Sequence, residues 1–473
     1  MKVVLHTLGC KLNQLETEAL ASSFRRQGFF IEDSMNPADI YVLNSCTVTS
    51  KSDQKGRKWL RQTLKKNPDA LVIATGCYAQ LEPEELSRIG KNVVVVGMEE
   101  KDRLLLFPGY LREHLEGLDQ GKVDFECKRE ILRQFLEESR PAGKNQFRYF
   151  PLDYNFHTRA FLKIQDGCDY SCSYCRVPLA RGKSVSLEAD RVIERFSELE
   201  SRGFREIVLT GVNINSYRDG DCDFVCLLEK LLDWKKAKLS KEGGKCRVRV
   251  RLSSLEPERI DDRLLSVLED EFFCPHFHLS VQSGSDEILK RMRRRYNSRR
   301  VLEAASALRR IKSDPFLAAD VIVGFPGEGE GDYRATYEIV ERIGFSKLHV
   351  FPYSNRPGTA ASLYRDHVPE RVRDERVHEL LRLSEKMHDQ YVRRWMGKRV
   401  TLLVESKRNG IISGVTENYL KVKVRLGERE VSVERGELVD VVLFGREDKE
   451  REGTDRETPS SQRDTRISGR LIH

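Results

Sequence analysis

The chain has 473 residues, of which 39% are hydrophobic and 33% charged, with a formal net charge of +8 at pH 7. The length predicts about three domains. The sequence has no apolar stretch of about 18 residues and no signal-peptide pattern, so we expect a cytoplasmic protein with no membrane segment. The positive charge is compatible with a nucleic-acid partner, and eleven cysteines indicate metal ligation more than disulfides.

Residues 1–107 alternate short apolar runs with amphipathic segments. The apolar runs predict strands, and the segments between them predict helices at residues 13–27 and 51–66. Such alternation predicts an open, parallel α/β sheet with helices on both faces. The expected strands are residues 3–7, 40–43, 71–75 and 93–96.

Three cysteines follow three of these strands directly: Cys10, Cys46 and Cys77, called here the first triad. Open α/β sheets build their sites at the carboxyl ends of strands. Any one of these cysteines alone is more simply a small buried residue. Three at equivalent positions predict the ligands of a [4Fe–4S] cluster that keeps one iron open. The first turn has no G-x-G-x-x-G pattern, which disfavours a nicotinamide-binding fold.

Residues 108–154 are predicted to form a helical insertion and a linker, because charged helix-forming residues precede a Pro-Ala-Gly-Lys-Asn segment. Cys127 lies there without cysteine partners nearby, so we interpret it as a structural residue. The same interpretation covers Cys222, Cys226, Cys246 and Cys274, with Cys222 and Cys226 on one face of a helix.

A second triad, Cys168, Cys172 and Cys175, forms a C-x3-C-x2-C array after a predicted strand at residues 161–165. Three thiolates on one short loop can hold three corners of a [4Fe–4S] cluster and leave the fourth iron open. The alternatives are a zinc knuckle with a distant fourth ligand, or three unrelated thiols. The spacing is not that of the usual zinc pairs, and the cluster is favoured.

With Tyr174 before its third cysteine, this array resembles the radical SAM enzymes. In that family the open iron binds S-adenosylmethionine, and one electron from the cluster cleaves it to a 5′-deoxyadenosyl radical. The resemblance implies a central domain that binds S-adenosylmethionine.

Residues 155–396 again alternate strands and helices, and the strands fit a partial (β/α)6 barrel. Functional groups gather at the carboxyl ends of such strands. The radical SAM resemblance therefore implies S-adenosylmethionine contacts there, with ordinary strand-to-helix turns as an equal alternative. The expected strands are residues 160–165, 206–210, 247–252, 276–281, 318–323 and 347–351. The candidate contacts are Tyr174, Thr210, Gly211, Asn213, Ser254, Gln282, Ser283 and Gly324.

A dense positive segment runs from Lys290 to Tyr296 and continues at Arg299 and Arg300. Arginine suits phosphate contacts and stacking. A solvated helix face is the default interpretation of such a run, with RNA contact as the alternative.

After a polar helix, short β segments, one of them at residues 430–433, predict a small antiparallel barrel over residues 397–445. It resembles the TRAM module, an RNA-binding barrel, in which Tyr419 would stack on a base. A barrel with an ordinary charged exterior is the alternative. Residues 446–473 are nearly free of apolar side chains, so we expect a disordered tail. The candidate phosphate contacts are Lys398, Arg399, Lys407, Arg408, Lys421, Lys423 and Arg425.

The sequence around the first triad reads HTLGCKLNQ at residues 6–14, NSCTVT at residues 44–49 and TGCYAQ at residues 75–80. Together with the second triad, these motifs resemble the methylthiotransferases, in their tRNA-modifying MtaB branch. The resemblance implies an α/β multidomain enzyme with a [4Fe–4S] cluster on each triad. A sulfur on the first cluster takes a methyl group from one S-adenosylmethionine, and the radical made at the second cluster activates C2 of an adenine, which receives the methylthio group.

The implied substrate is N6-threonylcarbamoyladenosine at position 37 of tRNA, next to the anticodon on its 3′ side. The implied partners are the tRNA anticodon stem-loop and a cytosolic electron donor such as flavodoxin or ferredoxin, and we expect a monomer. Sister branches offer isopentenyladenosine in tRNA or a ribosomal-protein side chain as alternative substrates, and the motif at residues 6–14 argues against both. An iron–sulfur RNA-binding protein without turnover is an alternative from a different class.

Overall fold

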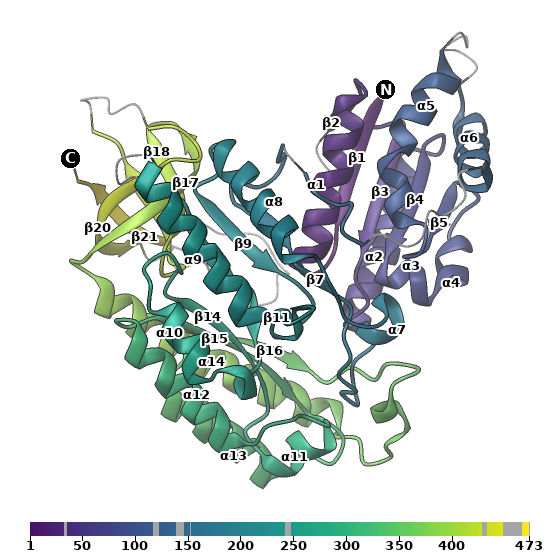
Figure 1. Ribbon diagram of the computed structural model, residues 1–473. Helices are drawn as coiled ribbons and strands as arrows, with labels where there is room; N and C mark the ends of the chain where they lie inside the picture. Colours follow the sequence, from purple (N-terminus) through teal and green to yellow (C-terminus); the bar gives the residue numbers. More distant parts are fainter. Residues whose placement is uncertain are drawn as a thin grey trace.

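Figure 1 shows the computed structural model of the protein, which describes residues 1–32, 36–116, 123–138, 146–151, 153–241, 247–427, 433–447 and 466–472. The central domain lies between an N-terminal α/β domain and a small C-terminal β-barrel (Figure 1). Within these ranges no helix is both long and apolar enough to span a membrane. The α/β multidomain class expected from the sequence is confirmed.

The N-terminal domain contains a five-stranded parallel sheet in the order β2-β1-β3-β4-β5. Its strands β3 and β4 are buried along their whole length, because helices cover both faces of the sheet. The strands are β1 (Lys2–Thr7), β2 (Phe30–Glu32), β3 (Ile40–Ser45), β4 (Leu71–Gly76) and β5 (Val93–Val96). The helices are α1 (Lys11–Arg26), α2 (Ser50–Lys66), α3 (Cys77–Leu81), α4 (Pro83–Ser87) and the 3-10 helix η1 (Lys101–Leu105).

The segment expected to be an insertion forms two helices, α5 (Phe107–Leu115) and α6 (Phe125–Glu138). Their apolar faces join the core of α1 and the sheet, where Phe107, Leu132 and Phe135 are buried. Burying such side chains fully contributes about 1.5–3 kcal/mol each. The expected boundary at residue 107 therefore falls inside one continuous core.

The central domain is a half-barrel of parallel strands in two sheets, β12-β9-β6 and β13-β14-β15-β16, linked by a bridge between Val250 and Phe273. Its largest apolar core lies between these strands and the surrounding helices. The main strands are β6 (Ala160–Lys163), β9 (Glu206–Thr210), β12 (Arg249–Leu252), β13 (Ser254–Leu255), β14 (His276–Gln282), β15 (Phe316–Val323) and β16 (Lys347–Pro352). The helices are α8 (Ala189–Ser201), α9 (Phe224–Lys241), α10 (Asp262–Leu268), α11 (Asp286–Arg291), α12 (Ser298–Ile311), α13 (Glu330–Ile343) and α14 (Glu370–Trp395).

Shorter elements follow the strands of the half-barrel. They include the pairs β7 (Gln165–Asp166) with β8 (Val185–Ser186) and β10 (Arg218–Asp219) with β11 (Cys222–Asp223). The short helices are α7 (Val177–Arg181), η3 (Ile214–Ser216), η4 (Pro257–Arg259) and η5 (Ala360–Leu363).

Five strands close the C-terminal barrel in the order β17-β18-β19-β21-β20. The expectation of a wholly disordered tail is wrong, because β21 pairs with β19 and β20. Ile467 fills the barrel core and Gly469 lets the strand pass close to β19, a pattern too short to stand out in a charged tail. Residues 448–465 and most of the strand expected at 430–433 lie outside the described residues. The strands are β17 (Arg399–Arg408), β18 (Ile411–Thr416), β19 (Lys421–Arg425), β20 (Leu438–Glu447) and β21 (Arg466–Leu471).

Two cysteines differ from expectation. Cys222 lies in β11 and Cys226 in the first turn of α9, and the two form a disulfide with their Cα atoms 5.3 Å apart. The sequence predicts structural residues on one helix face, but the chain turns between strand and helix and brings the two sulfur atoms together. Cys127 is half-buried and Cys274 buried, while Cys246 lies outside the described residues.

Candidate active site between two cysteine triads

The first triad lies at the carboxyl edge of the N-terminal sheet. Cys10 caps α1, Cys46 follows β3 and Cys77 begins α3 directly after β4. Two glycines with left-handed backbone let these turns converge. A Cβ at Gly9 (φ 124°) would lie 2.5 Å from the Cβ of Cys46, and one at Gly76 (φ 97°) would lie 2.4 Å from a backbone carbonyl oxygen.

The second triad lies on the loop between β7 and α7. The backbone N–H two residues later donates to the sulfur of Cys168 and to that of Cys175, at 3.4 Å in both cases. The guanidinium of Arg294 donates to the sulfur of Cys172 at 3.2 Å, across 122 positions of sequence. Hydrogen bonds to sulfur are the contacts that tune iron–sulfur sites.

The chemistry of both donor sets fits a cationic cluster. Burial and the neighbouring thiols raise the pKa of Cys46 to about 12, and the same causes raise the pKa of Cys175 to about 12. Gathering three thiolates is therefore unfavourable without cationic iron to offset their charge. Among the described residues, no group of three Cys, His, Asp or Glu side chains is placed to hold a single metal ion. A cubane instead takes thiolates at separate corners.

A cavity of about 230 Å³ lies between the triads. Cys77 of the first triad and Cys175 of the second both line it, so the two sets share one cavity. Its walls combine apolar side chains with a few polar groups, as small-molecule sites do. The other lining residues are Thr47, Val48, Thr49, Tyr174, Arg176, Val177, Ala180, Gln282, Asp320, Ile322, Phe351, Pro352, Tyr353 and Ser354.

Of the candidate S-adenosylmethionine contacts, Tyr174 and Gln282 line this cavity. Asn213 is buried, and neither the nitrogen nor the oxygen of its side-chain amide has a hydrogen-bond partner. Buried polar groups are normally hydrogen-bonded, so this amide is free to bind a ligand. Thr210 ends β9, Gly211 packs against Gln165, and Ser254 begins β13.

Two other candidates have structural partners. The hydroxyl of Ser283 lies 3.1 Å from that of Thr336 on α13, and the N–H of Gly324 donates to Glu328 at 2.8 Å. Neither lines the cavity between the triads. Their assignment as S-adenosylmethionine contacts stays a prediction.

Arg294 is a residue whose role the sequence did not reveal. It was counted within a basic run, yet its guanidinium contacts both Cys172 and the carboxylate of Glu256. Burial raises the pKa of Glu256 to about 7, against the opposing effect of Arg294. No local sequence pattern signals this role, because Arg294 lies between α11 and α12 and its side chain reaches a loop that is distant in sequence.

A buried network of charges joins the first triad to the central domain. Arg181, at the end of α7, donates to Asp166 at 3.1 Å, to Glu16 at 3.0 Å and to Asn13 at 2.8 Å. Lys101 also pairs with Glu16, and Lys163 pairs with both carboxylates. These cations hold the pKa of the Glu16 carboxyl well below its usual value despite its burial. The network fixes the domain interface beside both triads.

Two further arginines also bridge the N-terminal and central domains. Arg356 of the central domain donates to Thr47 at 2.6 Å and to Asp53 at 2.5 Å, and Arg176 donates to Glu82 at 2.7 Å. Because these contacts border the lining residue Thr47, they hold the N-terminal domain over the cavity.

The expected RNA-binding groups are only partly free. All seven candidate cations of the C-terminal barrel are exposed. The expectation that Tyr419 is available to stack on a base is wrong. Its ring packs 4.2 Å from that of His276, with the guanidinium of Arg251 5.0 Å from its centre, because the barrel docks on the central domain at this point.

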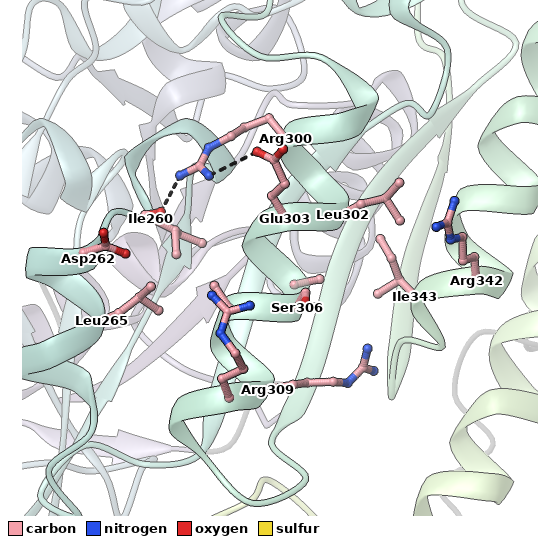
Figure 2. A pocket seen from close by; sticks show the side chains of 13 residues that line it. Ile260, Asp262, Leu265, Arg300, Leu302, Glu303, Ser306, Arg309, Arg342 and Ile343 are labelled. Carbon is pink, nitrogen blue, oxygen red and sulfur yellow. Dashed lines mark hydrogen bonds and ion pairs between the residues drawn. The ribbon is translucent and has the colours of Figure 1, made fainter.

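A larger cavity, of about 570 Å³, lies on the outer face between α10, α12 and α13. Figure 2 shows its arginines, with Arg300 held by the Ile260 carbonyl and by Glu303. It contains no residue of either triad, so it is not the catalytic cavity. Arg300 thus also has intramolecular partners.

Two family models match parts of this chain. The profile of the Radical SAM superfamily matches residues 162–340, and that of Uncharacterized protein family UPF0004 matches residues 2–97. The chain is 37% identical to the threonylcarbamoyladenosine tRNA methylthiotransferase MtaB of Treponema pallidum (strain Nichols), over 89% of this chain and 94% of that protein.

Two further relatives are informative. The protein of the same name from Aquifex aeolicus (strain VF5) is 36% identical, over 94% of this chain and all of that protein. The tRNA-2-methylthio-N(6)-dimethylallyladenosine synthase of Endomicrobium trichonymphae is 30% identical, over 89% of this chain and 93% of that protein. The chain therefore belongs to the radical SAM methylthiotransferase family, in its MtaB group.

Proposed function

We propose that this enzyme adds a methylthio group to C2 of N6-threonylcarbamoyladenosine at position 37 of tRNA. The observation that best supports this proposal is the cavity lined by both Cys77 of the first triad and Cys175 of the second. A base held there meets both triads at once, as a reaction that needs sulfur and a radical at one carbon requires. The relatives named for this substrate support the assignment.

Members of this family use S-adenosylmethionine and two [4Fe–4S] clusters, which supply the methyl group, the sulfur and the radical when bound. We assign one cluster to the first triad and the other to the second. The donors to the sulfurs of the second triad, above all Arg294, would set the charge at that site. The unpartnered amide of the buried Asn213 is a candidate to bind S-adenosylmethionine.

The cavity walls favour a flat base. Val48, Tyr174, Ile322 and Phe351 provide apolar surface against which a flat base can pack. A base in a single-stranded loop can be turned out into such a pocket at low cost, which favours the anticodon loop as the target. The exposed cations of the C-terminal barrel would hold the RNA backbone.

The same proposal includes a cytosolic electron donor such as flavodoxin or ferredoxin, action in the cytoplasm and a monomeric enzyme. Isopentenyladenosine is the second candidate substrate, because a relative named for the dimethylallyl compound is 30% identical.

The test uses full-length reconstituted enzyme and two anticodon stem-loops, one with threonylcarbamoyladenosine and one with isopentenyladenosine. Mass spectrometry of the nucleosides should show methylthiolation of the first only. Efficient turnover of the isopentenyl substrate would move the enzyme to the sister branch. Activity on neither RNA, with product on a ribosomal protein, would contradict tRNA as the substrate.

A further inference from the structure

One acidic side chain lies on the wall of the cavity between the triads. Asp320 lies on β15, and Ile322, two residues further along the same strand, lines the cavity as well. Alternate residues of a strand face the same side of a sheet, so this face of β15 is directed into the cavity. The second triad follows β6 and β7, at the carboxyl end of the parallel strands. Asp320 therefore lies one step deeper in the half-barrel than Ile322.

Two histidines lie beside Asp320 on the neighbouring strands. The Nε2 atom of His278 on β14 lies 2.9 Å from Oδ1 of Asp320, and the ring of His278 stacks on that of His349, with the ring centres 5.1 Å apart. Asp320 is the register partner of His349 on β16. Among the described residues, no hydrogen bond or ion pair reaches the second carboxylate oxygen, Oδ2. The carboxylate therefore keeps an acceptor for a ligand.

The other charged group of the cavity wall is already paired. Among the described residues that line this cavity, Asp320 is the one acid and Arg176 the one base, and Arg176 lies 2.7 Å from Glu82. Burial alone would raise the pKa of Asp320, but His278 and His349 hold this pKa below its usual value. An ionised carboxylate accepts hydrogen bonds and donates none. Asp320 is thus the charged group of this cavity that is open to an N–H or O–H donor.

The surroundings of Asp320 make such a donor important. The side chain keeps 25% of its surface exposed, so a ligand in the cavity can reach it. The wall beside it includes the apolar side chains of Ile322 and Phe351. A ligand that fills the cavity removes water from the carboxylate, and an acceptor left unpaired in apolar surroundings is costly. A ligand that brings its own donor is therefore favoured over one that does not.

The shape of adenine relates this carboxylate to the reacting carbon. C2 and the N6 nitrogen lie at the two ends of one edge of the ring, with N1 between them. A base whose C2 faces Cys77 and Cys175 can therefore direct its N6 nitrogen away from the triads, towards Asp320. An N6 nitrogen with one substituent keeps one hydrogen, which is a donor of the required kind.

We propose that Asp320 accepts a hydrogen bond from the N6–H of the substrate base, and so requires an adenine with one substituent, not two, at N6. This inference rests on the proposed function, because it takes the substrate to be an N6-threonylcarbamoyl adenine. A site with a fixed acceptor rejects an analogue that lacks the donor, because the acceptor is then left unpaired. Asp320 is thus a specificity residue of the cavity between the triads.

The experiment compares two anticodon stem-loops, one with threonylcarbamoyladenosine and one with the same nucleoside methylated at N6. Methylation removes the hydrogen and leaves the carboxylate and hydroxyl of the substituent in place. Dissociation constants are measured for the full-length reconstituted enzyme and for Asp320→Leu and Asp320→Asn. Asp374→Leu, at an exposed position of α14, is the matched control. Wild-type enzyme should bind the unmethylated RNA about ten- to a hundredfold more tightly, the range of one hydrogen bond to a charged group.

The preference should vanish in Asp320→Leu, which has a similar size but no acceptor, persist in part in Asp320→Asn and be unchanged in Asp374→Leu. Equal binding of the two RNAs by wild-type enzyme would overturn the inference. A preference that survives in Asp320→Leu would do the same, because it would then arise from crowding by the methyl group.

Two further outcomes separate the inference from its neighbours. A loss of S-adenosylmethionine affinity in Asp320→Leu without RNA, by the same factor, would overturn the inference and assign the carboxylate to that molecule. Wild-type turnover of an isopentenyladenosine stem-loop alone would instead overturn the proposed substrate. The failure of the inference and the failure of the proposed function are therefore distinguishable.

Discussion

The two triads assemble the same set of donors from different parts of the chain. The first draws Cys10, Cys46 and Cys77 from three strand ends, and it exists only when the parallel sheet has formed. The second lies within one loop, from position 168 to position 175. A site built on strand ends is held rigidly by the sheet, whereas a site on a loop needs contacts from other parts of the chain. For the second triad, the hydrogen bond from Arg294 to Cys172 is such a contact.

The surroundings of the triads differ as well. Beside the first triad, Arg181 belongs to a buried network in which it compensates two carboxylates. Beside the second, Arg294 donates directly to a cysteine sulfur. Charge near the first triad therefore serves the domain interface, as Arg176 does beside the second, whereas Arg294 contacts a sulfur of the second triad directly. The predictions below test this division.

The largest expected effect is on product formation, and it distinguishes the role of the first triad from that of the second. Replacement of Cys10, Cys46 and Cys77 by Ala should abolish methylthiolated product but leave 5′-deoxyadenosine formation with dithionite, because the second triad is intact. Replacement of Cys168, Cys172 and Cys175 should abolish both. Chromatography of the nucleoside products measures each. If the second variant kept the cleavage and the first lost it, the assignment of the triads would be reversed.

Iron content tests the triads as cluster ligands. Anaerobic reconstitution should give about eight iron atoms per chain, and either triple substitution should leave about four. Iron and sulfide are measured chemically and the clusters by Mössbauer spectroscopy. A protein that keeps one cluster through both substitutions would contradict the two-site arrangement.

The buried network should matter most for stability. Arg181→Met leaves Glu16 and Asp166 with a missing cation, so the free energy of unfolding should fall by about 3–5 kcal/mol. Denaturant unfolding of wild-type and variant enzymes measures the change. Arg371→Met, at an exposed pair with Glu375 on α14, should change it by less than about 1 kcal/mol. Equal effects of the two substitutions would show that the network contributes no more than a surface pair.

Arg294 should act on the second cluster alone. Loss of its charge disfavours the more negative, reduced cluster, so Arg294→Gln should lower the reduction potential by about 60 mV or more. Arg294→Lys should recover part of the shift. A redox titration followed by EPR in the Cys10/Cys46/Cys77 variant isolates this cluster. An unchanged potential in Arg294→Gln would mean that Arg294 only positions Glu256.

The sequence was sufficient for features that repeat locally. Alternating apolar runs predicted the parallel sheets, and cysteines at strand ends or at close spacing predicted the triads, because strand direction alone brings such positions together. Arg294 could not be assigned, since its partner Cys172 lies 122 positions away. β21 and the packing of the partly buried Tyr419 ring were missed for a similar reason: each depends on a surface supplied by a distant strand.

The smallest expected effect concerns tRNA affinity, which should be separable from both triads. Truncation at Gly397 would uncover Arg249 and Arg251, whose guanidinium groups donate to backbone carbonyls of the C-terminal barrel, so point substitutions are the cleaner test. Lys407→Ala and Lys423→Ala remove exposed cations without touching that contact.

Each phosphate contact releases counterions, so each loss should flatten the plot of log affinity against log salt by roughly one unit. Cleavage of S-adenosylmethionine in the absence of tRNA should be unchanged in the double variant. Lys65→Ala, on the exposed face of α2, is the control for a general loss of positive charge. If the control flattened the plot as much as the barrel variants, tRNA would be held by the charge of the whole protein, and the C-terminal barrel would have no special part in binding it.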